Sequence, residues 1–141
     1  MIDWSNPSDP VSHHFSVKEC LWLPSWSRLA NADELTDNIK SSLIDLCYTM
    51  DKIRDLVGKP VSVHVTFRPE AYNTLIGGAE DSAHKFGQAM DWSVNGMSCD
   101  DLRILLIPKL EEFQVRMENK PGSNWVHIDR AQPHPNRYFI P

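Results

Sequence analysis

Ser82-Ala-His-Lys-Phe-Gly-Gln-Ala-Met-Asp91 decides the fold together with Trp125-Val-His-Ile-Asp129 further along the chain. Residues 89–94 and the second stretch both alternate polar with apolar side chains, the pattern of a strand with one buried face. The two stretches supply two imidazoles, those of His84 and His127, and the carboxylate of Asp91. Three such ligands leave one tetrahedral position open, as catalytic zinc sites do. The sequence therefore predicts a split metal site.

Length and composition restrict the classes of protein to consider. The chain has 141 residues, of which 41% are hydrophobic and 23% charged, as expected for one globular domain over 1–141. We expect residues 1–12 to form an N-terminal arm and 131–141 a proline-rich tail. The net charge of −5 comes without a block of Lys or Arg, so nucleic acid is excluded as a partner. No apolar run is long enough to span a bilayer, which excludes membrane insertion. The sequence does not indicate an oligomeric state.

The cysteines and the N-terminus bear on the cellular compartment. Cys20, Cys47 and Cys99 are odd in number and form no C-x-x-C pair, which argues against a disulfide framework and a thiolate zinc site. We expect buried free thiols. The first residues lack a basic segment followed by an apolar one, so no secretory signal is expected and the chain is predicted to be made in the cytoplasm.

Capping residues and apolar spacing predict four helical segments. A capping box at Ser16-Val-Lys-Glu19 begins a short helix, and Asn31-Ala-Asp-Glu34 begins the main one, which ends at Gly58. A third segment runs from Pro69 to about Ile76. The fourth begins at Ser98 and is interrupted by Pro108.

Alternation predicts four strands. Residues 61–68 and 89–94 each have one polar face, and 113–117 with 125–129 form a hairpin around the turn residues 118–123. The tail is too rich in proline for regular structure. The predicted fold is a single α+β domain with a mainly antiparallel sheet and helices packed on one side.

Several motifs in a fixed order resemble one family. They are Ser82-x-His-x-x-Gly-x-Ala-x-Asp91, His14-Phe-Ser-x-x-Glu19, Arg54-x-x-Val-Gly-Lys-Pro60 and Thr66-Phe-Arg-Pro-x-x-Tyr-Asn73. The chain is similar to the zinc D-alanyl-D-alanine carboxypeptidases and related peptidoglycan peptidases, whose fold is shared with the Hedgehog signalling domain. The resemblance covers most of the chain except the first dozen residues and the tail.

The resemblance implies one zinc ion held by His84, Asp91 and His127. It also implies that Arg68 binds the carboxylate or carbonyl of a peptide substrate, with Ser82 assisting near the metal. Arg68 falls on the polar face of its predicted strand, where a guanidinium fork suits a carboxylate. The implied reaction is amide hydrolysis in peptidoglycan stem peptides, and which bond is cut stays open. Trp125 shares a face with His127 and is expected to border the cleft.

One position departs from the family pattern. Asn124 stands three residues before the last histidine, where the family has a carboxylate, and an amide cannot act as a general base. Asp129, on the face of His127, is one candidate to replace the missing base, and the alternative is that it orients a metal ligand. Glu118, near the hairpin turn, is a more distant candidate. Otherwise the chain is a weakened enzyme, an original aspartate has been changed, or the protein binds without cleaving.

Two functions follow from this departure. The first is a zinc peptidase of the carboxypeptidase or endopeptidase type, suited to a bacteriophage endolysin or a virion component that reaches the wall after release. The alternative is a non-catalytic structural or wall-binding protein that retains the zinc site.

Overall fold

The first helix begins where the sequence predicts. In the computed structural model, which describes residues 1–131 and 136–141, Ser16 caps α1 (Val17–Leu21). Its hydroxyl accepts from the backbone of Glu19, and the carboxylate of Glu19 accepts from the backbone of Ser16 at 3.0 Å. This reciprocal pair satisfies two backbone donors at the helix start, which confirms the capping box.

The predicted start of the main helix was wrong. α2 (Asp37–Val57) begins after Thr36, whose hydroxyl accepts from the backbone of Ile39. The predicted cap at Asn31 instead begins the short 3₁₀ turn η2 (Ala32–Glu34). Two capping signals follow each other within six residues, and the second one carries the helix. Gly58 ends α2 at φ 76°, a conformation that favours glycine.

The remaining helices are short and match the predictions. α3 (Glu70–Leu75) follows Pro69, and α4 (Cys99–Leu106) is capped by Ser98. The segment around Pro108 is the 3₁₀ turn η4 (Ile107–Lys109), after which α5 (Leu110–Phe113) continues. Two more 3₁₀ turns are η1 (Pro24–Trp26) and η3 (Ala83–Phe86).

Two sheets contain all the strands of the described residues. β1 (Trp22–Leu23) and β2 (Arg28–Leu29) form a small antiparallel pair. The main sheet has the order β3-β4-β6-β5-β7. Its strands are β3 (Ser62–Val65), β4 (Ala89–Ser93), β5 (Arg116–Glu118), β6 (Val126–Asp129) and β7 (Tyr138–Phe139). All neighbours are antiparallel except β5 and β7, so the predicted α+β fold with a mainly antiparallel sheet is confirmed.

Strand boundaries differ from the predictions in three places. β3 ends at Val65, after a register shift between Val63 and Val65. The hairpin is confirmed, but β5 begins at Arg116 because Phe113 closes α5. The tail is not free of regular structure: Tyr138 and Phe139 pair in parallel with β5. Residues 132–135 of the predicted tail lie outside the described residues.

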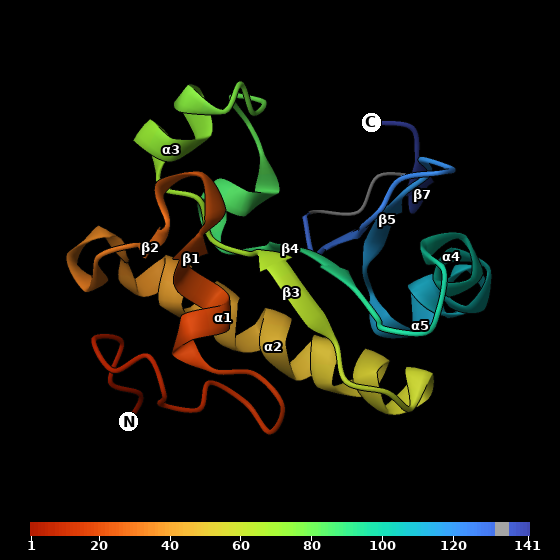
Figure 1. The fold of residues 1–141 in the computed structure, drawn as a ribbon, viewed down its shortest axis with the longest axis horizontal. Helices are drawn as coiled ribbons and strands as arrows, with labels where there is room; N and C mark the ends of the chain where they lie inside the picture. Colours follow the sequence, from red (N-terminus) through yellow and green to blue (C-terminus); the bar gives the residue numbers. More distant parts are fainter. Residues whose placement is uncertain (132–135) are drawn as a thin grey trace.

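The faces of the main sheet differ in polarity. Met90, Trp92 and Ile128 are fully buried and belong to the same core cluster as Leu43 and Leu46 of α2. α2 therefore packs against this face, and in Figure 1 it runs below β3 and β4 while α3 stands above them. The predicted alternation is confirmed, and it leaves the polar residues of β4 and β6 on the opposite face.

Within residues 1–131 and 136–141, every helix is too short or too polar to cross a bilayer.

Candidate metal centre

His84 is held on a short turn beside the end of β3. The hydroxyl of Ser82 accepts from the backbone of His84 and begins η3. The Nδ1 of His84 lies 2.7 Å from the carbonyl oxygen of Thr66. Because a carbonyl only accepts, Nδ1 must carry the proton. The other ring nitrogen, Nε2, is left as a lone-pair donor that points toward Asp91, 3.2 Å from its Oδ1.

Asp91 and His127 face each other across two neighbouring strands. The sheet register pairs Asp91 of β4 directly with His127 of β6. The Nδ1 of His127 lies 2.9 Å from Oδ1 of Asp91, and its Nε2 lies 2.8 Å from Oδ2 of Asp129. Ligand atoms of His84, Asp91 and His127 all fall within 4.8 Å of one another, and all three residues are buried.

These donors fit a metal ion. In a tetrahedral site with metal–nitrogen distances of about 2.0–2.1 Å, neighbouring donors lie roughly 3.3 Å apart; here two of the separations are 2.9 and 3.2 Å. Nδ1 of His84 and Nε2 of His127 are committed to Thr66 and Asp129. The two remaining lone pairs face one carboxylate oxygen, and a cation among them converts this repulsion into attraction.

Protons take that role in the metal-free protein. Burial would lower the pKa of His127, but its hydrogen bonds to Asp129 and Asp91 raise it to about 9. Burial would raise the pKa of Asp91, yet its close contacts with the imidazoles of His84 and His127 lower it below its ordinary range. A proton shared with the carboxylates thus keeps His127 charged at neutral pH.

Asp129 orients His127 from behind. It is 1% exposed, and it also accepts two hydrogen bonds from Arg116, from Nε at 2.8 Å and Nη2 at 3.0 Å. Burial opposes ionisation of Asp129, but the hydrogen bonds from His127 and Arg116 lower its pKa. The guanidinium of Arg116 lies over the ring of Phe139, 4.3 Å from its centroid. Arg116, held over Phe139, therefore keeps the carboxylate of Asp129 in place, and that carboxylate orients the ring of His127.

Arg68 lies on the other side of the three ligands. Its Nη2 is 3.5 Å from Oδ2 of Asp91, and its Nη1 is 3.5 Å from Oδ1 of Asn73. Its Nε is buried and bonds to no described residue. A buried guanidinium donor without an acceptor is costly, so Arg68 has capacity left for an acidic or carbonyl group of a ligand.

A cavity of about 400 Å³ lies beside His127. Its carboxylates are Asp81, Glu118 and Asp129, and Ser82 also lines it. The register of β5 and β6 pairs Arg116 with Asp129 and Met117 with Ile128. One further step places Glu118 opposite His127 on the same face of the sheet.

The comparison with known proteins agrees with this arrangement. A protein-family model described as Peptidase M15 matches residues 21–129, a span that includes all three ligands and Arg68. The chain belongs to the peptidase M15 family. No curated protein sequence matches it. This family consists of metallopeptidases, and the His-Asp-His group of this chain is able to hold a metal ion.

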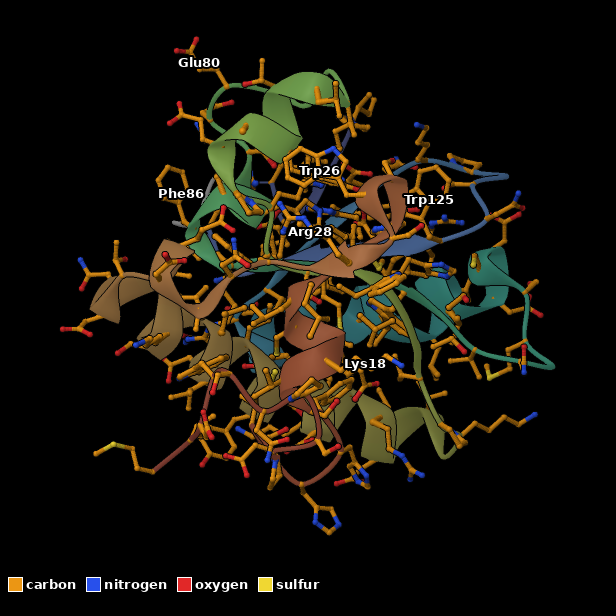
Figure 2. The ribbon with its side chains drawn as sticks, turned by 60° about the vertical axis from the view of Figure 1, so that its left-hand side comes forward. Lys18, Trp26, Arg28, Glu80, Phe86 and Trp125 are labelled. Atoms are coloured by element: carbon orange, nitrogen blue, oxygen red, sulfur yellow. The ribbon has the colours of Figure 1, made fainter. Side chains whose placement is uncertain are left out.

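Two residues singled out in the sequence lie apart from the cavity beside His127. Asn124 lines a separate hollow with Ser98 and Asp100 on the α4 side of the sheet. Trp125 is 40% exposed and stacks under Lys120, whose Nζ is 5.7 Å from the ring centroid. In Figure 2, Trp125 and Phe86 lie on opposite sides of the view, and Phe86 is the one of the two that lines the cavity.

Sequence reasoning missed the residues that hold the ligands in place. Arg116 and Phe139 were not identified, although alternation along the hairpin puts Arg116 on the face of Asp129. The role of Thr66 is carried by its backbone carbonyl, for which a side-chain pattern gives no signal. Asn73 was noted only as part of a motif, and its side chain donates to the carbonyl of Ala79 at 2.8 Å.

Proposed function

We propose that the protein is a zinc peptidase that hydrolyses peptide bonds in the stem peptides of peptidoglycan. The observation that carries the proposal is the convergence of His84, Asp91 and His127 beside a cavity lined by the carboxylate of Glu118. Family membership supports a peptidase, and the donor set suits zinc. A zinc ion bound in such a site polarises a peptide carbonyl and makes a water molecule more acidic.

The residues around the ligands divide the remaining work. Glu118 takes the proton from the attacking water and passes it to the leaving amine. It forms no ion pair within the described residues, whereas Asp129 is bound by Arg116 and His127. The geometry therefore favours Glu118 over Asp129 as general base. Asn124 is exposed and lines another hollow, so the base function does not depend on it.

Arg68 and Ser82 position the substrate in this proposal. Arg68 offers a buried Nε and a partly committed guanidinium next to Asp91, which suits the carboxylate or carbonyl of a peptide. Ser82 lines the cavity and begins the turn that carries His84. Trp125 lies outside the lining of this cavity, and its contact with the substrate stays a prediction. The biological setting we propose is cell-wall lysis or remodelling by a phage-derived endolysin or virion component.

Digestion of purified peptidoglycan tests the function. The zinc-loaded protein should release new amino termini, and the masses of the products identify the bond that is cut. A chelator should stop the release, and added zinc should restore it. Protein that holds zinc and releases nothing would instead be the non-catalytic wall-binding protein.

Two variants test the assignment of the base. Glu118→Gln should lower the hydrolysis rate by about 10²–10⁴-fold without changing the zinc content. Asn124→Asp is the matched control and should leave the rate unchanged. A large gain in rate from Asn124→Asp, with Glu118→Gln close to the parent, would reassign the base to position 124.

A further inference from the structure

Two of the cysteines meet in the core. Cys20 on α1 and Cys47 on α2 are both fully buried, and their Sγ atoms lie 3.4 Å apart. A disulfide bond is about 2.05 Å long, so the sulfurs are about 1.4 Å from bonding distance. Cys99 on α4 is partly exposed and contacts no other sulfur in the part of the chain that the structure describes. The only close thiol pair among these residues is Cys20 with Cys47.

We propose that Cys20 and Cys47 form a disulfide when the chain folds in the presence of a small disulfide oxidant such as oxidised glutathione. One thiolate attacks the oxidant and releases a glutathione thiolate, which leaves a mixed disulfide on the protein. The second thiolate attacks that bond and releases the second glutathione. The protein loses two electrons and two protons, and the oxidant becomes two thiols.

Burial sets when the bond forms. The hydrogen bond with Cys20 and burial raise the pKa of the Cys47 thiol well above its ordinary value, and thiols react as thiolates. An oxidant in solution therefore reacts slowly with the folded dithiol. The bond forms before the core closes, and once formed it is shielded from reductants by the same burial.

The bond would join α2 to the segment that supports the metal centre. The carbonyl of Cys20 accepts from the backbone of Phe67 at 3.1 Å, and the hydroxyl of Thr66 donates to the carbonyl of Glu19 at 3.1 Å. Thr66 in turn accepts from Nδ1 of His84. Oxidation thus ties α1, and with it the segment after β3 that orients His84, to the longest helix.

Refolding in a glutathione redox buffer tests the proposal. The full chain is unfolded under reducing conditions, refolded with oxidised and reduced glutathione, and quenched with acid. The intact mass should fall by two hydrogen atoms, and peptide mapping should find Cys20 linked to Cys47. Cys99→Ser is the matched control and should give the same link. Three free thiols, glutathione left on Cys20 or Cys47, or links that involve Cys99 would overturn the proposal.

Unfolding in urea gives a second measurement that does not depend on a variant. The link spans 27 positions, and closing a loop of this length should lower the unfolding equilibrium constant by roughly 400-fold. The urea midpoint of the oxidised protein should therefore exceed that of the reduced protein. An oxidised protein with a lower midpoint would show that the native core does not accommodate the bond.

Discussion

Asp129→Asn tests whether the orientation of His127 controls the metal centre. Asp129 is buried and accepts four hydrogen bonds, two from Arg116, one from Nε2 of His127 and one from the backbone of Ala131. The amide keeps the shape but removes the charge, and its NH₂ group has to face a donor on either Arg116 or His127. In either orientation the ring of His127 loses the charged acceptor that fixes its tautomer and makes Nδ1 available to the metal.

The expected size follows from that loss. Removing the hydrogen-bond partner of a metal-ligating histidine weakens metal affinity by about 10–100-fold, which corresponds to about 1.4–2.7 kcal/mol. Zinc affinity is measured by competition with a chromophoric chelator, beside far-UV circular dichroism to show that the variant is folded.

Asp81→Asn provides the control for this measurement. Asp81 lines the same cavity but is exposed and bonds to none of the three ligands. Its variant should bind zinc as the parent does. A folded Asp129→Asn variant with zinc affinity within twofold of the parent would refute the orienting role.

Three further outcomes are expected. Folding raises the pKa of His127 from 6.5 to about 9, so its contribution to the stability of the metal-free protein is complete below pH 6.5 and is lost as the pH rises through about 9. The free energy of unfolding, measured in urea with a chelator, should fall by up to about 3 kcal/mol across that range, and a flat profile would contradict the bridging imidazolium. Zinc at a hundred times its dissociation constant should add about 2.7 kcal/mol to the free energy of unfolding and so raise the midpoint of thermal unfolding. His84→Ala should abolish this rise. Ser16→Ala should cost about 1 kcal/mol in urea unfolding with zinc affinity unchanged, whereas an unchanged midpoint would show that the capping box contributes nothing.

Local signals in the sequence predicted most of the fold. The capping box at Ser16, the interruption at Pro108 and the hairpin that ends in Asp129 depend on neighbouring residues and were confirmed. The start of α2 was misplaced because Asn31 and Thr36 both have capping chemistry, and packing decides between such neighbours. β7 was missed because its parallel partner β5 is distant in the sequence, and composition carries no information about such pairing.

The candidate site divides in the same way. The three ligands come from motifs with fixed spacing, so the sequence was sufficient to bring them together as an expectation. The positions of Glu118 and Arg116 depend on the register of the hairpin, and the support for His84 comes from the carbonyl of Thr66. Backbone contacts and register are properties of the folded chain. The roles of Arg116 and Thr66 therefore emerged only from the structure, and Glu118 was named from the sequence only as a distant substitute for the base.

The direct pairing of Asp91 with His127 also has a consequence for assembly of the sheet. A slip of one residue between β4 and β6 would turn one of these side chains toward the apolar core, since successive residues face opposite sides. Only the native alignment then offers all three ligands to a metal ion. A metal ion bound at these three residues would therefore favour the native strand alignment over misaligned forms that a purely hydrophobic face would tolerate.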